Sequence, residues 1–485
     1  MTPLIIFITL VVYTGLIFFI SWITSRKADN QSFFIGNRKS PWVVVAYGMV
    51  GASLSGVTYI SVPGWVGSTH FTYFVMVLGY IVGYAVVSTV LLPVYYKLNL
   101  TSIYTYLDNR FGNSSYKTGS VFFLISRVIG ASFRMFLVVE VLQIFVFNHF
   151  GIPFWATVVL FLALIHLYTL KGGIKTIVWT DIFQTTFMLL SVIITVGMLI
   201  HVMHTSFSEM WKTVWSSGYS KILVTHVKSS ENFMKLFISG AFITIAMTGL
   251  DQDMMQKNLS CRNLKDAQKN MTLLSLILVP VNMIFLFLGA VLFIYVGHFN
   301  MHMPASSDNL FPDIALNHLG VAGGVIFFIG LIAAAYSSAD SALTALTTSL
   351  SIDILELDKK FAGDEEKLKR RRQYVHFFMM FAIIFVILIF KVINDQAIIA
   401  ALFTFAGYTY GPLLGLFGFG LFTKFKVRDK WVPVVAVASP FMAYFFSRFL
   451  QFVFDGYKTG FEILLINGLF TFIGLMILRV KHSYN

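Results

Sequence analysis

The chain has 485 residues, of which 57% are hydrophobic and only 12% are charged. A soluble globular protein carries roughly 25% charged residues, so this composition predicts a membrane protein with many spans. The formal net charge of +13 does not indicate a nucleic-acid partner, because the basic residues lie between apolar segments rather than on one soluble face. The single cysteine, Cys261, excludes an intramolecular disulfide. The sequence has no HExxH, paired CxxC, GxxxxGKS/T or GxSxG motif, which argues against a metal hydrolase, an ATPase or a lipase.

Thirteen apolar segments have the length of about 20 residues that a membrane-spanning helix needs. They cover residues 3–24, 41–64, 71–96, 117–147, 153–170, 177–204, 233–256, 270–297, 321–350, 374–392, 396–423, 431–452 and 460–479. The connections between them are too short for a folded soluble domain. The sequence therefore predicts an all-α, polytopic membrane protein in which residues 1–485 form a single membrane domain.

The positions of the basic residues predict how these segments are oriented. Arg26 follows the first segment, and Lys257, Arg262, Lys265 and Lys269 follow the seventh. Over all connections, about 26 of the 35 basic residues lie on one side, which is expected to be cytoplasmic. The sequence thus predicts a multi-pass protein of the plasma (inner) membrane, with its N-terminus outside and its C-terminus in the cytoplasm.

The ninth segment places hydroxyl groups and a carboxylate within the membrane. At 100° per residue, one stripe holds Ser337, Ser341, Thr344 and Thr348, with Ala334 and Ser338 on one flank and Asp340 on the other. Such hydroxyls often bond to the carbonyl four residues back. Adjacent Ser337 and Ser338, however, point into one groove together with the carbonyl oxygen of Ala334. A cluster of oxygen ligands, mostly neutral, indicates a hard monovalent cation rather than a transition metal.

Glycine and proline interrupt the second segment, in the stretch GASLSGVTYISVPGWVG from Gly51 to Gly67. Glycine weakens a helix and Pro63 lacks an N–H donor, so the backbone is expected to unwind and expose carbonyl groups. Broken helices of this kind form ion and solute sites in secondary transporters. The alternative is a proline kink between packed helices.

Ionisable residues in two further segments have both a structural and a functional interpretation. Asp181 and Gln184 resemble an N-cap pair for the sixth segment, and Asp181 is equally suited to face inward as a cation ligand. Arg127 and Arg134 lie on one face of the fourth segment. Such an arginine either binds a substrate carboxylate or pairs with an acid such as Glu140 or Asp251.

The sequence resembles the sodium/solute symporter family, which includes sodium-glucose, proline, pantothenate, iodide and sialic acid transporters. The resemblance rests on the order and spacing of five motifs: GASLSG, GGIKTIVWTDIFQ, TGLDQDMMQKNLSCRN, AAAYSSADSAL and AGYTYGPLLGLF. It implies a leucine-transporter-like core of two inverted five-helix repeats, residues 41–204 and 233–423. An extra helix, residues 3–24, precedes the core, and two helices within residues 431–479 follow it.

The resemblance also implies the ion sites. The main sodium site joins backbone oxygens of Gly51, Leu54 and Ala334 to the hydroxyls of Ser337 and Ser338. Some relatives bind a second sodium ion through the acid that matches Asp181 and the same two serines. They can add a third hydroxyl where this chain has Ala334, and Asp340 is a hypothetical replacement for it.

For the solute, the resemblance implies contacts from Ser53, Ser55 and Thr58. It places Val77 where sugar and sialic acid carriers often have glutamine or glutamate, and this departure weakens a simple sugar assignment. Sialic acid carriers use an arginine that Arg127 or Arg134 matches.

From these features we expect a sodium-coupled symporter that imports a small polar solute by alternating access, such as sialic acid or another carboxylate-bearing solute. A sodium-coupled sugar or amino-acid symporter is the alternative of the same class. An intramembrane enzyme using Asp181, Asp251 or Asp340, and a passive channel or substrate sensor, are the alternatives of other classes. The expected partners are the solute, sodium ions and membrane lipid, with no other cofactor, no transition metal, no nucleic acid and no obligatory protein partner.

Overall fold

The computed structural model describes residues 3–26, 28–393, 398–455 and 457–480. The chain is built of helices, and two short strands, β1 (Lys426–Val427) and β2 (Arg479–Val480), pair in antiparallel orientation. This architecture confirms the predicted all-α class.

The helices follow one another with short connections. The longer α-helices are α1 (Pro3–Ser25), α3 (Trp42–Thr69), α4 (Tyr73–Val86), α7 (Asn113–Phe145), α8 (Phe154–Gly172), α9 (Ile174–Val202), α10 (Phe207–Ser216), α11 (Phe233–Thr244), α13 (Leu264–His298), α15 (Gly320–Ser349), α17 (Glu365–Ile393), α18 (Ile398–Phe422), α19 (Val432–Val453) and α20 (Ile463–Ile477). The shorter ones are α2 (Asn30–Ile35), α5 (Leu92–Lys97), α6 (Thr105–Arg110), α12 (Gln252–Leu259), α14 (Leu310–Asp313) and α16 (Leu357–Lys360). Four helices end in a turn of π-helix: α4 continues into Val87–Leu91, α11 into Ile245–Gly249, α14 into Ile314–His318 and α15 into Leu350–Ile354. Short 3-10 helices lie at Gly36–Arg38, Phe147–Phe150, Gly218–Ser220, Ser307–Asn309 and Asp429–Trp431.

Eleven of the described helices are long and apolar enough to cross a membrane, and the bent pair Phe233–Gly249 with Gln252–Leu259 makes a twelfth when it is counted as one span. Each predicted segment coincides with one of these spans or with α20, although the predicted start at residue 396 lies outside the described residues. Helix α20 has 15 residues, fewer than the about 20 that cross a bilayer. The count of thirteen spans therefore stays a prediction.

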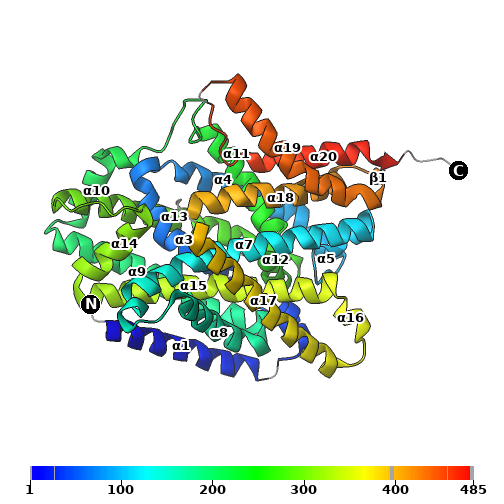
Figure 1. Cartoon of the computed structure of the whole chain (residues 1–485), viewed down its shortest axis with the longest axis horizontal. Helices are drawn as coiled ribbons and strands as arrows, with labels where there is room; N and C mark the ends of the chain where they lie inside the picture. Colours follow the sequence, from blue (N-terminus) through cyan, green and yellow to red (C-terminus); the bar gives the residue numbers. More distant parts are fainter. Residues whose placement is uncertain (1–2, 27, 394–397, 456, 481–485) are drawn as a thin grey trace.

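Most of the long helices run along one common direction (Figure 1). The start of α1 lies at the same end of the bundle as α10, whereas α16 and β1 lie at the opposite end. Helix α3 packs against α9, α13 and α15. Every residue of α15 from Gly330 to Ser349 is buried, so the hydroxyl-rich ninth segment lies in the protein interior and not against lipid.

Two glycines let α3 approach α9 closely. A Cβ atom built on Gly48 would lie 2.7 Å from the Cβ of Asp181, and one built on Gly51 would overlap the Oγ1 of Thr185. Small residues at helix interfaces allow such close approach within membranes. They place the backbone of α3 against polar side chains of α9.

Two of the spans are broken. In α3 the backbone of Ser55 leaves helical geometry, with φ 56° and ψ 174°, as its glycine-rich surroundings predict. Helices α11 and α12 meet at an angle of 65°. Asp251 begins α12 by accepting hydrogen bonds from the backbone N–H groups of Asp253 (2.8 Å) and Met254 (3.4 Å). The two breaks fall in the first helix of each expected five-helix repeat.

Polar contacts join the helices at the end that carries α16. Arg110 donates hydrogen bonds to the carbonyl oxygens of Gly420 (3.1 Å) and Thr423 (2.7 Å). Lys117 forms an ion pair with Glu356 at 2.5 Å. These contacts tie α6 and α7 to α18 and to the segment after α15.

Candidate functional site

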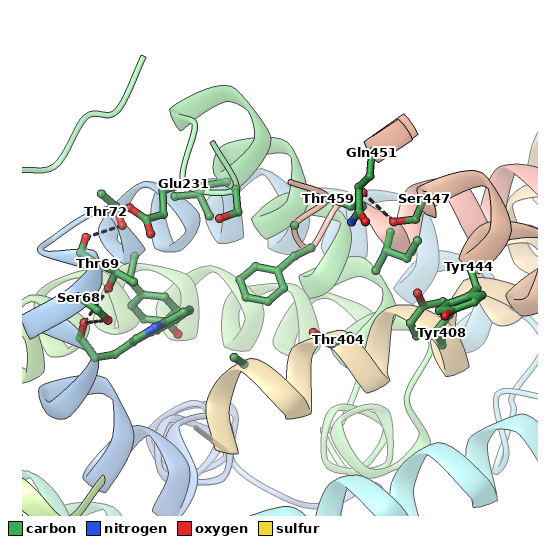
Figure 2. A pocket seen from close by; sticks show the side chains of 18 of the residues that line it. Ser68, Thr69, Thr72, Glu231, Thr404, Tyr408, Tyr444, Ser447, Gln451 and Thr459 are labelled. Atoms are coloured by element: carbon green, nitrogen blue, oxygen red, sulfur yellow. Dashed lines mark hydrogen bonds between the residues drawn. The ribbon is translucent and has the colours of Figure 1, made fainter. Parts of the chain in front are cut away.

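A cavity of about 520 Å³ lies beside the turn between α3 and α4. Figure 2 shows side chains from the end of α3 and the turn after it on one side of this space, and side chains of α19 on the other. Its polar lining residues are Ser68, Thr69, Thr72, Tyr73, Ser230, Glu231, Thr404, Tyr408, Tyr444, Ser447, Arg448, Gln451 and Thr459. We call it the outer cavity, and its many hydroxyl groups suit a space that holds water.

A smaller cavity of about 90 Å³ lies nearer to the break in α3, and Tyr73 lines both cavities. We call it the inner cavity. It brings together five of the six residues expected at the solute site, namely Ser53, Ser55, Thr58, Arg127 and Arg134. The sixth, Val77, is fully buried and is not among the described residues that line this cavity.

Helix α4 contributes tyrosines to the inner cavity where the sequence suggested Val77. Tyr73, Tyr80 and Tyr84 line it, and the hydroxyls of Tyr73 and Tyr80 lie 3.1 Å apart. Intervals of seven and four residues place all three on one helix face. This spacing, in an otherwise apolar helix, is the signal by which sequence reasoning would have found them.

The two arginines of α7 have different surroundings. Arg127 forms ion pairs with Asp251, at 3.6 Å, and with Asp253, and Asp251 is one of the two acids that the structural interpretation named. Within the described residues no carboxylate oxygen lies within 4.0 Å of a side-chain nitrogen of Arg134, and its Nε has no hydrogen-bond partner there. Arg134 is only 8% exposed. Of the two arginines, it is therefore the one free to bind an anion.

The residues expected at the main sodium site lie on α3 and α15, two helices that pack against each other. Leu54, Ala334, Ser337 and Ser338 are at most 3% exposed, and a Cβ atom on Gly51 would lie 3.3 Å from the Oγ of Ser337. A helix interrupted at Ser55 is expected to leave the carbonyl groups of residues 51–54 without intrahelical partners. The backbone of α3 at Gly51 thus approaches the hydroxyl of Ser337 in a buried place.

Asp181 lies inside the protein and does not cap a helix. Helix α9 begins seven residues earlier, with Gly173 at its N-cap position, so the interpretation of Asp181 and Gln184 as an N-cap pair is wrong. Asp181 is 1% exposed. Its Oδ2 lies 2.6 Å from the Nζ of Lys257, and its Oδ1 accepts a hydrogen bond from Ser337 at 2.7 Å. The carboxylate faces inward, as the alternative interpretation required, and its partner is a lysine.

Lys257 was expected in a cytoplasmic connection, and this expectation is wrong. The residue lies in α12 and is 1% exposed. All eight residues of α12 are buried although five of them are polar, because each polar side chain reaches a partner on another element or on the backbone. A short polar segment after an apolar one has the composition of a solvated loop, and composition alone therefore misplaced it.

Asp340 is fully buried close to this ion pair. Its carboxylate accepts hydrogen bonds from the hydroxyl of Tyr168 (2.8 Å), the side-chain amide of Gln184 (3.5 Å) and the backbone N–H of Ser341 (2.6 Å). Its oxygens are thus engaged by neutral donors of α8, α9 and α15.

Comparisons with known proteins agree with this geometry. Residues 33–428 match the model of the sodium:solute symporter family. The chain is 24% identical over 460 residues to the sodium/sialic acid symporter SiaT of Proteus mirabilis (strain HI4320), covering 90% of this chain and 88% of that protein. It is 22% identical to the sodium/sialic acid symporter NanT of Aliivibrio fischeri (strain ATCC 700601 / ES114), covering 86% and 83%. It is 24% identical to sodium-coupled monocarboxylate transporter 1 of Mus musculus, covering 82% and 65%.

Solved structures share the fold. A substrate-bound, outward-open Na⁺-coupled sialic acid symporter aligns over 99% of both chains, with a TM-score of 0.83 and 20% identity. Mhp1, a nucleobase-cation-symport-1 family transporter in a closed conformation, aligns over 92% of this chain and 93% of its own, with a TM-score of 0.58 and 15% identity. The leucine-transporter-like fold is thereby confirmed, and the family match spans most of the sequence. The chain belongs to the sodium:solute symporter family, and is a multi-pass membrane protein of the secondary-transporter class rather than an enzyme.

Proposed function

We propose that this symporter imports a small carboxylate-bearing solute, with sialic acid as the first candidate. The observation that carries the proposal is Arg134, which lines the inner cavity and has no carboxylate partner among the described residues. A buried charge without a partner is destabilising. A solute carboxylate that accepts two parallel hydrogen bonds from the guanidinium supplies the missing partner. The names of SiaT, NanT and the mouse monocarboxylate transporter all specify solutes with a carboxyl group.

The remaining lining of the inner cavity suits the neutral part of such a solute. Ser53, Ser55 and Thr58 lie on the broken helix and line the inner cavity together with the tyrosines of α4. Hydroxyl groups both donate and accept hydrogen bonds, so they match a polyhydroxylated chain or ring. A neutral sugar is the second candidate because it fits the same hydroxyls. It leaves the guanidinium of Arg134 unpaired, however, and the acid is therefore favoured.

The proposed sodium site joins the backbone oxygens of Gly51, Leu54 and Ala334 to the hydroxyls of Ser337 and Ser338. The close approach of α3 and α15 at Gly51 and Ser337 supports it. A sodium ion held there fixes the first half of the broken helix α3 against α15. Because the solute residues follow directly along α3, sodium binding completes the solute site, which couples the two ligands.

The proposed state is outward-facing, with the N-terminus outside. The outer cavity lies beside the α3–α4 turn, which is an external connection in the predicted topology. The opposite end, where α16 lies (Figure 1), is held together by the contacts of Arg110 and Lys117. Two inverted repeats, residues 41–204 and 233–423, would rock against each other so that these contacts separate and release the ligands inside.

The test begins with thermal unfolding of the detergent-purified protein in sodium or in potassium, each with and without sialic acids, sugars, amino acids and simple carboxylates. A ligand that binds only the folded state raises the unfolding temperature. We expect stabilisation by sodium alone and a further, sodium-dependent stabilisation by a carboxylate. Identical curves in sodium and potassium would contradict sodium coupling, and stabilisation by neutral sugars alone would contradict the acidic solute.

Uptake into proteoliposomes provides the second measurement. An inward sodium gradient should drive accumulation of the stabilising solute above its external concentration. A channel or a sensor cannot concentrate a solute, so equilibration without accumulation would contradict symport.

A further inference from the structure

We infer that the ammonium group of Lys257 is a built-in cation that takes the place of a second sodium ion, so that one sodium ion moves in each transport cycle. The inference rests on the proposed sodium-coupled function and deepens it. It concerns Asp181, the acid through which a second sodium ion was expected to bind.

Both oxygens of the Asp181 carboxylate are already used. Oδ2 lies 2.6 Å from the Nζ of Lys257, and Oδ1 accepts the hydrogen of the Ser337 hydroxyl at 2.7 Å. The side chains of Asp181 and Lys257 are each 1% exposed, so water does not weaken their attraction much. A sodium ion at this carboxylate would have to displace the ammonium group or lie beside it. Two like charges at one carboxylate repel strongly in a buried place.

The space around the pair leaves little room for an additional ion. Gly48 of α3 faces Asp181 so closely that a Cβ atom there would lie 2.7 Å from the Cβ of Asp181. The resemblance implies that relatives can supply a third hydroxyl at position 334, where this chain has alanine. Asp340 does not replace it, because its oxygens are held by Tyr168, Gln184 and the backbone of Ser341.

The pair also orients a ligand of the proposed main site. The Ser337 hydroxyl donates its hydrogen to Asp181, so its lone pairs remain free for a cation. The backbone of α3 approaches this oxygen at Gly51. Lys257 thus acts as a positioning residue that neutralises Asp181 while leaving the serine oxygen available. Because Lys257 belongs to α12 and Asp181 to α9, the ion pair also connects the two expected repeats without sodium.

The experiment counts sodium ions bound to the purified full-length protein, using ²²Na⁺ at saturation together with sodium titrations of the unfolding temperature in which choline replaces sodium. The wild type should bind one ion, with a Hill coefficient of about 1. Lys257→Met exposes the Asp181 carboxylate and should bind one ion more, with a Hill coefficient above 1 and a stability that depends more on sodium. The double variant Lys257→Met/Asp181→Asn removes both charges and should bind one ion again.

Lys391→Met is the matched control, because it also breaks a lysine–carboxylate pair, with Glu140 at 2.7 Å, but away from the site. It should leave the ion count unchanged. Two ions on the wild type, or an unchanged count in Lys257→Met, would overturn the inference. If Lys257→Met does not fold, the wild-type and double-variant counts decide the question, and two ions on either overturns it. A wild type that binds no sodium contradicts the proposed function instead, and the role of Lys257 is then judged by whether Lys257→Met gains an ion.

Discussion

Replacement of Arg134 by methionine should abolish much of the affinity for a carboxylate solute while leaving the fold intact. A hydrogen bond to a charged group contributes about 1.5–3 kcal/mol. Loss of the guanidinium should therefore raise the solute Kd by about 10- to 150-fold. Sodium binding in the absence of solute should be unaffected, because Arg134 lies on α7 and the proposed ion site lies on α3 and α15.

Arg127, seven residues away on the same helix, is the matched comparison. Its guanidinium pairs with Asp251 and Asp253, so Arg127→Met leaves two buried carboxylates without their cation. Breaking a buried pair typically destabilises a protein by about 3–5 kcal/mol. Removing Arg134 breaks no such pair, so the unfolding temperature of Arg134→Met should equal or exceed that of the wild type.

Isothermal titration calorimetry with the stabilising solute measures the affinity, and thermal unfolding measures the stability. Arg134→Lys keeps the charge but lacks the planar fork of donors, so it should recover only part of the affinity. The reasoning is refuted if Arg134→Met binds the carboxylate as tightly as the wild type, or if Arg134→Met loses as much stability as Arg127→Met.

Two further substitutions and one measurement of transport current test other parts of the mechanism. Ser338→Ala removes a proposed sodium ligand and should raise the sodium concentration needed for half-maximal stabilisation by about tenfold; an unchanged sodium titration would exclude this hydroxyl as a ligand. Gly51→Ala places a methyl group over the Oγ1 of Thr185 and should lower the unfolding free energy by about 1–3 kcal/mol, with partial recovery when Thr185→Ala is added; full stability of the single variant would contradict the close packing. Transport of a monovalent carboxylate with one sodium ion carries no net charge. When such a solute is added to proteoliposomes on a solid-supported membrane, we therefore expect no sustained transport current. A sodium-dependent inward positive current would indicate a second ion.

The sequence predicted those features that depend on local composition. Long apolar segments locate the helices because lipid admits few other residues, and the break in α3 at Ser55 lies next to Gly56, in the glycine-rich stretch that the sequence pointed to. Burial of Ser337 and Ser338 followed from their place in an apolar segment. The same local reasoning suggested that Arg127 either pairs or binds substrate, and only the fold could choose between these roles.

The errors arose where a side chain finds its partner far away in the sequence. Lys257 was counted with the loop charges because its neighbours are polar, yet Asp181, which is 76 positions away, holds it inside. Asp181 has the spacing of a capping residue relative to Gln184, but Gly173 already starts the helix with φ 49°. Burial of a charge depends on a tertiary ion pair, and a single sequence does not record that pairing.

The position of Lys257 has a consequence for how far the solute can be concentrated. A tenfold sodium gradient supplies about 1.4 kcal/mol per ion, and a net charge crossing 100 mV adds about 2.3 kcal/mol. A monovalent carboxylate that moves with one sodium ion gains only the first contribution, which limits accumulation to about tenfold. With two ions, about 5.1 kcal/mol would support about 5,000-fold accumulation. An ammonium group that stays with the protein adds to neither contribution, because it returns with the empty carrier. Lys257 would thus make transport of a carboxylate insensitive to membrane potential. Export would begin once the ratio of internal to external solute concentration exceeds the ratio that the sodium gradient alone sustains.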